Sequence, residues 1–313
     1  MPLSHFPKGV SSFGIPVMGS GSSEIPVTTG TYYFVDSNLG NAGNTGLDPT
    51  AALATIQQAI TKTTASKYDV IIVMPGHAET IATATAFDLN KIGVSIIGLG
   101  RGALRPTISL SLAAATLTVS AADCMMKNLV VKAIEADILV AMVSTSTNCT
   151  FDSIEFTEPT AGENIITCIG SSPVAKGSNG LTINACKRYS VDAATVAMIS
   201  ILEDCSHLTI TNCVDVHTYG ANVGQFLILG AFDMWNAVIV GNKLHVVGDN
   251  SGQTVGNLIT GSSTASDGIV AYNLVSGVDV GGLLDTAGLE FGHNENYFTG
   301  TVAKCGDLIP TTA

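Results

Sequence analysis

Residues 208–216 read Leu208-Thr-Ile-Thr-Asn212-Cys-Val-Asp-Val216, two short runs of alternating apolar and polar residues joined at an asparagine. The same phrase returns along the chain, for example as Cys124-Met-Met-Lys-Asn128-Leu-Val-Val131 and as Ile269-Val-Ala-Tyr-Asn273-Leu-Val275. The residues at the turns are 128, 153, 184, 212, 242, 273 and 294, so the steps between copies range from 21 to 31 residues. A period of this length, built from short strands and turns, is typical of a solenoid.

A further apolar run separates neighbouring copies, as in Ala197-Met-Ile-Ser-Ile201, so each coil has room for a third strand. We therefore predict an all-β fold, a parallel β-helix of about seven or more coils, as one domain over residues 31–300. One helix is expected near 49–63, where Asp48 and Pro49 are a suitable N-cap and first position. It would cap the open end of the solenoid, whose strand edges would otherwise be exposed.

The two ends of the chain differ from the repeat. Residues 1–30 are rich in proline and glycine and show no period of 2 or 3.6, which predicts an extended N-terminal arm. Several of its residues are too apolar for a solvent-exposed tail that binds nothing. We therefore expect an anchor that binds another protein through Phe6, Pro7, Phe13, Ile15 and Val17. Residues 301–313 are expected to form a short C-terminal tail.

The composition excludes some partners and favours others. The formal net charge is −12, and phosphate binding needs clustered Lys and Arg, so we expect neither nucleic acid nor an anionic membrane as a partner. Hydrophobic residues make up 46% of the chain and charged residues only 12%, with no uncharged apolar run of 18 residues. The surplus apolar surface predicts contacts between subunits, and a rod-like solenoid is well suited to a homotrimer. The seven cysteines are expected to be mostly buried thiols in a protein made in a reducing cytoplasm.

Two resemblances refine this picture. The stretches Tyr33-Phe-Val-Asp36, Leu53-Ala-Thr-Ile-Gln-Gln-Ala-Ile60 and Asp69-Val-Ile-Ile-Val-Met-Pro-Gly76 resemble the capping region of pectate-lyase-like right-handed β-helix proteins. The opening Phe6-Pro-Lys-Gly-Val-Ser-Ser-Phe-Gly-Ile-Pro-Val17, with Gly268-Ile-Val-Ala-Tyr-Asn-Leu-Val275, resembles a family of β-helix proteins encoded by tailed phages and prophages. The first resemblance implies a right-handed helix, and the second implies a virion assembled in the host bacterial cytoplasm.

The phage resemblance implies a virion structural protein without enzymatic activity, either a capsid-associated head decoration or a short spike. Its arm would bind the major capsid protein or another virion protein. The alternative is a tailspike-like β-helix that binds or hydrolyses carbohydrate, with a host surface glycan as its ligand. Because a fold does not imply a function, the two hypotheses must be separated by the residues on the surface.

Glycoside hydrolysis needs two carboxylates that flank the scissile bond. Alternation places Glu155, Lys187, Asp215 and His245 at matching outward positions of four successive coils. Glu155 and Asp215 would then lie about 9.6 Å apart, at the upper edge of the range of about 6.5–9.5 Å for inverting enzymes. A ladder of alternating charge explains the same residues without catalysis. We therefore expect no activity, with Glu155 and Asp215 as the only candidate pair.

Metal and cofactor chemistry has little support in the sequence. His77 and Glu79 share a strand face and are of ligand type, but no third ligand is visible. Phosphate loops, dinucleotide fingerprints and nucleophile elbows are absent from the sequence. We expect neither a metal nor a cofactor.

Overall fold

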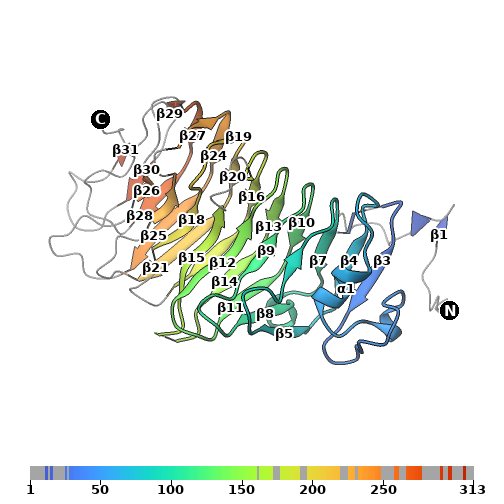
Figure 1. The fold of residues 1–313 in the computed structure, drawn as a ribbon. Helices are drawn as coiled ribbons and strands as arrows, with labels where there is room; N and C mark the ends of the chain where they lie inside the picture. Colours follow the sequence, from blue (N-terminus) through green and yellow to red (C-terminus); the bar gives the residue numbers. More distant parts are fainter. Residues whose placement is uncertain are drawn as a thin grey trace, which may run out of the picture.

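The computed structural model describes residues 25–26, 28–160, 162–171, 177–190, 196–218, 225–229, 232–247, 257–260 and 266–276, and five short strands outside these ranges. It confirms the right-handed parallel β-helix, in which three long sheets run along the axis of the solenoid (Figure 1). Seven coils contribute a strand to all three sheets. Within the described part of the chain, no helix is long and apolar enough to cross a membrane.

Successive coils add neighbouring parallel strands to each sheet. The first sheet contains β3 (Tyr32–Val35), β4 (Val70–Val73), β7 (Ser95–Gly98), β10 (Met125–Lys127), β13 (Thr150–Asp152), β16 (Thr182–Asn184), β20 (Thr209–Thr211), β24 (Ala237–Val240), β27 (Gly268–Ala271) and β29 (Glu290–Phe291). The second sheet contains β5 (Ala78–Ile81), β8 (Thr107–Leu110), β11 (Val130–Ala133), β14 (Glu155–Thr157), β17 (Lys187–Tyr189), β21 (Val214–Thr218), β25 (Lys243–Val247), β28 (Leu274–Ser276), β30 (Glu295–Tyr297) and the antiparallel β31 (Gly306–Asp307).

The third sheet and two smaller pairs complete the strands. The third sheet contains β6 (Asp88–Leu89), β9 (Leu117–Val119), β12 (Ile138–Ser144), β15 (Ile165–Ser171), β18 (Ala197–Ser200), β22 (Gln225–Ile228) and β26 (Asn257–Thr260). One pair is β19 (Cys205–Ser206) with β23 (Met234–Trp235), and the other is the antiparallel pair β1 (Ser11–Ser12) with β2 (Ile15–Pro16). Of the expected anchor residues, only the backbone of Ile15 is described; Phe6, Pro7, Phe13 and Val17 lie outside the described residues.

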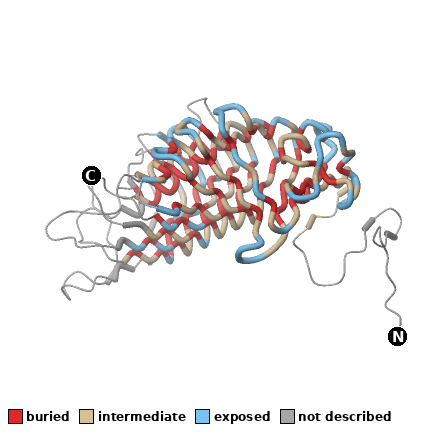
Figure 2. Tube along the Cα trace, turned by 90° about the horizontal axis from the view of Figure 1, so that it is seen from below, coloured by how far each residue is buried: buried red, intermediate tan, exposed pale blue. Residues whose placement is uncertain are grey.

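The core is a set of columns in which equivalent inward residues stack along the axis. In the first sheet one fully buried column consists of Ile96, Met126, Phe151, Ile183, Ile210, Ile239 and Val270. Buried residues alternate with more exposed ones along the strands (Figure 2), as the period of two in the sequence requires. This stacking buries apolar surface that no single coil could bury alone.

The corners between the first and second sheets each need one residue in the left-handed conformation. The turns at Asn128, Ser153 and Asn212 lie where the sequence predicts, with φ of 57°, 58° and 57°. At three other corners the left-handed residue is shifted by one position from the predicted asparagine, to Ala185, Gly241 and Tyr272. Asparagine was the signal for these turns because it tolerates positive φ better than other residues with a side chain, yet at these three corners it stands beside the turn.

The displaced asparagines at 242 and 273 are buried and form a ladder inside the solenoid. The Asn242 side chain donates to the Ile210 carbonyl at 3.0 Å, and its backbone N–H donates to Oδ1 of Asn273 at 2.9 Å. In the two coils before Asn242 the same column holds Cys213 and then Cys186, which confirms that these thiols stack. Each buried amide thus forms hydrogen bonds with backbone groups of the preceding coil, as buried polar groups must.

The capping helix is shorter than predicted. The segment near 49–63 contains a 3₁₀ turn, Pro49–Ala51, and then α1 (Ile56–Lys62) beside β3 and β4 at the N-terminal end of the solenoid (Figure 1). Thr55 caps α1 in a reciprocal capping box with Gln58, which breaks the expected helix into two pieces. The buried face of α1 covers the end of the core as expected, through Ile56, Ala59 and Ile60.

Candidate functional site

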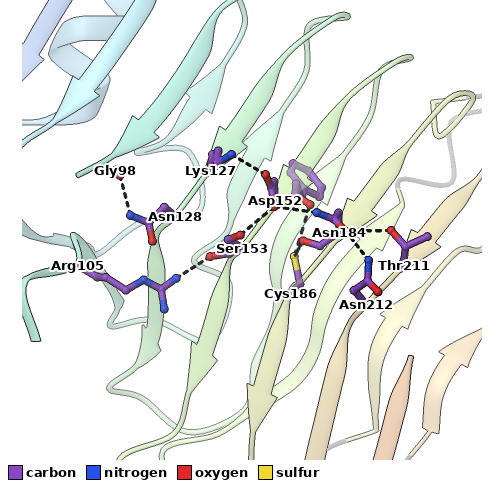
Figure 3. A network of polar contacts seen from close by, with 11 residues as sticks. Gly98, Arg105, Lys127, Asn128, Asp152, Ser153, Asn184, Cys186, Thr211 and Asn212 are labelled. Carbon is purple, nitrogen blue, oxygen red and sulfur yellow. Dashed lines mark hydrogen bonds and ion pairs between the residues drawn. The ribbon is translucent and has the colours of Figure 1, made fainter. Parts of the chain in front are cut away.

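A groove lies where one corner between the first and second sheets is enlarged. Most corners take two residues, but residues 99–106 between β7 and β8 form a loop that includes the 3₁₀ turn Gly102–Leu104. The Asn128 side chain holds the base of this loop by donating to the carbonyls of Gly98 at 2.8 Å and Gly100 at 3.1 Å (Figure 3).

The groove has two adjoining compartments of about 270 and 110 Å³. The larger is lined by Arg101, Gly102, Arg105, Asn128, Ser153, Ile154, Glu155, Ala185 and Lys187. The smaller is lined by Ile97, Gly98, Gly100, Arg101, Lys127, Asn128 and Ser153. Arg101, Asn128 and Ser153 border both compartments, so the two form one continuous surface feature across several coils.

Arg105 fixes the carboxylate of Glu155 in the larger compartment. Its Nη1 lies 2.5 Å from Oε2 of Glu155. Its Nη2 donates to the backbone carbonyls of Leu129 at 3.0 Å and Ser153 at 2.6 Å. The guanidinium therefore connects its own loop with two successive corners, and the planar fork of arginine is suited to such multiple donation.

A second carboxylate, Asp152, lies on the other side of the same corner. Lys127 Nζ is 3.0 Å from its Oδ2, while Asn184 Nδ2 at 3.1 Å and Ser153 Oγ at 2.9 Å donate to Oδ1 (Figure 3). Thr211 Oγ1 donates in turn to Oδ1 of Asn184 at 3.0 Å. Asp152 is thus held by three donors on the outer face of the first sheet, three residues before Glu155.

Two further cations border the larger compartment. Lys187 is the register partner of Glu155 on the neighbouring strand and is exposed, and Arg101 is exposed on the loop. Neither side chain makes an ion pair with any residue that the structure describes.

The structure places the two candidate carboxylates of the sequence in different environments. Glu155 is an outward residue in the groove, as predicted. The outward position of Asp215 is wrong: its side chain is buried and forms an ion pair with buried Arg188, at 2.6 Å from Nε to Oδ1. The outward column runs from Glu155 through Lys187 to Val214, so Asp215 lies one residue out of the predicted register.

The charge of Arg188 is stabilised inside the core by its acidic neighbours. Burial alone would lower the pKa of this guanidinium, but Asp215 and other neighbours outweigh burial and raise it. Glu158 and Ser190 are buried near the pair and share a hydrogen bond of 2.6 Å. This ion pair occupies the inward column of the second sheet and belongs to the core.

His77 and Glu79 share one face as predicted, and that face points inward. His77 Nε2 lies 3.4 Å from Oε2 of Glu79, which also accepts from the N–H of Ile56 at the start of α1. No group of three or more His, Cys, Asp or Glu side chains suited to a metal occurs among the residues with described positions. The carboxylate of Glu79 thus supports the cap.

A larger cavity of about 390 Å³ lies on the outer face of the first sheet nearer the N-terminus, between Pro26, Tyr68 and Met125. Its lining contains one charged residue, Asp123, whereas the lining of the groove contains four cations and the carboxylate of Glu155. The groove is therefore the better candidate for a functional site, because it contains more charged side chains than the larger cavity.

Sequence reasoning missed Arg101, Arg105, Lys127 and Asp152. A signal was present for Lys127 and Asp152, because each directly precedes a correctly predicted turn residue and is outward by alternation. The pairing of Arg105 with a residue 50 positions away had no signal in a single sequence.

Comparison of the sequence with protein-family models gave no match, and comparison with curated proteins gave none either. Among solved structures, the fold is similar to a GH136 lacto-N-biosidase from Eubacterium ramulus, with a TM-score of 0.52 and 11% identity over 86% of this chain. This chain covers only 64% of that enzyme's chain, less than two thirds of its length. It is also similar to a pectin methylesterase in complex with a hexasaccharide, with a TM-score of 0.50 and 14% identity over 87% of this chain and 91% of the other.

These likenesses establish a pectate-lyase-like parallel β-helix. The expectation that the protein is not an enzyme is also corrected, because both of these solved structures are carbohydrate-active enzymes. At 11–14% identity the likeness itself concerns the fold, so any activity must be argued from the groove.

Proposed function

We propose that this protein is a carbohydrate-active β-helix that binds a polysaccharide in the groove and hydrolyses its glycosidic bonds. The observation that carries the proposal is a pair of carboxylates on either side of one corner. Glu155 lines the larger compartment, and Asp152, three residues earlier, is paired with Lys127, which lines the smaller compartment. Each is held by a cation, and Asp152 also accepts hydrogen bonds from Asn184 and Ser153, so the acidic groups are positioned by the scaffold. Positioned groups are what acid–base catalysis requires.

The chemistry assigns complementary roles to the pair. One carboxyl group donates its proton to the glycosidic oxygen as the bond to the anomeric carbon breaks. The other carboxylate takes a proton from the water molecule whose oxygen bonds to that carbon, and the products are two shorter saccharides. Arg105 and Lys127 orient the two groups, and Asn128 and Ser153 offer neutral hydrogen-bonding groups to sugar hydroxyls in the same groove.

The direct experiment is an assay of reducing-end release from a panel of bacterial capsular, lipopolysaccharide and plant polysaccharides. The wild-type protein is expected to cleave a member of the panel, and Glu155→Gln and Asp152→Asn are each expected to lower kcat by at least about 100-fold. Glu135→Gln, which alters an exposed carboxylate outside the groove, is the matched control and should leave the rate unchanged. Equal loss in all three variants, or cleavage that survives both Glu155→Gln and Asp152→Asn, would refute the proposal.

The setting that we propose for this activity is a virion, on the strength of the N-terminal resemblance to phage proteins. A host surface glycan would then be the polysaccharide. Phe6, Pro7, Phe13, Ile15 and Val17 would attach the arm to the major capsid protein or to another virion protein. The test is incorporation into particles of a chain that lacks residues 1–24, which should fail if the arm is the anchor.

We also retain the homotrimer as a proposal. Exposed apolar side chains occur on or beside strands of the first sheet toward its C-terminal end, namely Trp235, Val238, Ile269 and Tyr272. Such a grouping is typical of a surface that another subunit covers. Light scattering at micromolar concentration should give the mass of three chains, and a stable monomer would contradict the proposal.

A further inference from the structure

We infer that the groove recognises an acidic saccharide, whose carboxylate or sulfate groups pair with Arg101 and Lys187. This inference rests on the proposed function and specifies the class of its substrate. It begins from the distribution of charge. Arg101, Arg105, Lys127 and Lys187 line the groove, which is four of the 13 Lys and Arg residues in a chain of net charge −12.

The charge that is left after internal pairing is positive. Arg105 is matched by Glu155, and Lys127 by Asp152. Arg101 and Lys187 have no such partner among the described residues, so the groove carries two uncompensated positive charges. In a protein with this excess of acidic residues, a local positive field is a distinctive feature of the surface, and it attracts anions.

Among the residues that line the larger compartment, Arg101 belongs to the first coil and Lys187 to the last. Arg101 belongs to the loop between β7 and β8, and Lys187 begins β17, three coils further along the axis. Coils are about 4.8 Å apart, so the backbones at these positions are separated by about 14 Å along the solenoid. Glu155 lies between them, one coil before Lys187. An extended chain that runs along the axis would therefore meet a cation on each side of the carboxylate.

An anionic ligand fits this arrangement better than a neutral one. Guanidinium donates two parallel hydrogen bonds to a carboxylate or sulfate, and ammonium acts as a point charge beside it. A neutral glycan would desolvate part of Arg101 and Lys187 without returning an opposite charge, which weakens binding. The arrangement therefore selects for charge on the sugars that flank the scissile bond.

The test is a set of binding titrations with Glu155→Gln, which prevents turnover, at 50 and 300 mM NaCl. The probes are oligogalacturonate for carboxylates, chondroitin sulfate for sulfate esters, dextran for a neutral glycan and single-stranded DNA for phosphodiesters. We expect an acidic glycan to bind with a Kd that rises several-fold with salt. When Arg101→Gln or Lys187→Gln is introduced singly into the Glu155→Gln protein, each should weaken this binding about tenfold. Lys67→Gln, at an exposed lysine on the cap, should have no effect.

The outcomes separate this inference from the proposed function. Preferential binding of dextran, of DNA, or of no acidic glycan overturns the inference, as does acidic binding that both substitutions leave unchanged. Cleavage of a neutral polysaccharide that depends on Glu155 would uphold the proposed hydrolysis and refute acidic specificity. Acidic binding that depends on Arg101 and Lys187, with no cleavage of the bound glycan by the wild-type protein, would uphold the specificity and refute the hydrolysis.

Discussion

Arg105 and Glu155 are 50 residues apart in the chain, and their side chains form an ion pair with 2.5 Å between Nη1 and Oε2. The partner is two coils away, so Arg105 passes the intervening corner, where it also bonds to the Leu129 carbonyl. One side chain therefore fixes the enlarged loop to the corner that carries the candidate carboxylate. The shape of the groove and the position of Glu155 depend on the same guanidinium.

Replacement of Arg105 by lysine tests this dependence. Lysine keeps the charge but cannot donate at once to Glu155, Leu129 and Ser153. We expect the free energy of unfolding to fall by about 1–3 kcal/mol and kcat to fall about tenfold, measured by urea titration and by the cleavage assay. Arg101→Lys is the control, since the Arg101 side chain is exposed and makes no ion pair with the residues that the structure describes. The free energy of unfolding of this variant should change by less than about 0.5 kcal/mol. Equal destabilisation by both would contradict the role of Arg105.

The buried pair predicts a different outcome for Asp215. Asp215→Asn leaves Arg188 charged in the core without its carboxylate, so we expect a loss of about 3–5 kcal/mol in the free energy of unfolding. Glu155→Gln, at the partly exposed groove position, should cost less than about 1 kcal/mol. Chemical denaturation of both variants measures the contrast. A stable Asp215→Asn protein would show that the core does not need the pair.

A double replacement separates the charge from the packing. Arg188→Met with Asp215→Leu removes both charges and keeps side-chain volume in the column. Because replacement of a buried ion pair by apolar residues is often neutral, the double variant should be more stable than Asp215→Asn alone. If the double variant is less stable than the wild-type protein, the ion pair itself contributes net stability.

The buried thiols predict a decline of stability in alkali. Burial is the main cause that raises the pKa of Cys124 to about 12 and that of Cys205 to about 12. An unfolded cysteine loses its proton near pH 8.5, so between about pH 9 and 12 the unfolded state binds fewer protons than the folded state. Stability should therefore fall as pH rises, by about 1.4 kcal/mol per pH unit for each thiol. Urea midpoints at pH 8 and 10.5 measure the slope.

A variant with both cysteines replaced by alanine is the matched control for this slope. It should be less stable at pH 8, because a buried side chain is lost, and should depend less on pH. A slope identical to that of the wild type would assign the alkaline loss to other groups.

The repeat in the sequence was sufficient for the fold because its signal is redundant. Each of several coils repeats the same alternation, so an error at one turn leaves the rest of the pattern intact. The turns at Asn128 and Asn212 were correctly placed, whereas the turn assigned to Asn273 falls on Tyr272. There the asparagine is conspicuous in the sequence for a different reason, namely the hydrogen bond from its side chain to the Ile239 carbonyl of the preceding coil.

The sequence predicted the outward position of Glu155 but not the buried position of Asp215, because the latter depends on an ion pair between side chains of different coils. Asp215 lies between Val214 and Val216, so alternation alone assigns the valines to the core and the aspartate to solvent. The structure reverses this order, because Arg188 occupies the inward column one coil earlier and Asp215 compensates its charge. Local alternation cannot reveal such a long-range pair.

The most direct test of the central claim is a crystal structure of Glu155→Gln with an oligosaccharide from the polysaccharide that the wild type cleaves. The account predicts a saccharide that lies along the axis of the solenoid in the groove, in contact with Asn128, Ser153 and Lys187, with a glycosidic oxygen near the side chain of residue 155. A saccharide bound on another face of the β-helix, with the groove unoccupied, would contradict it.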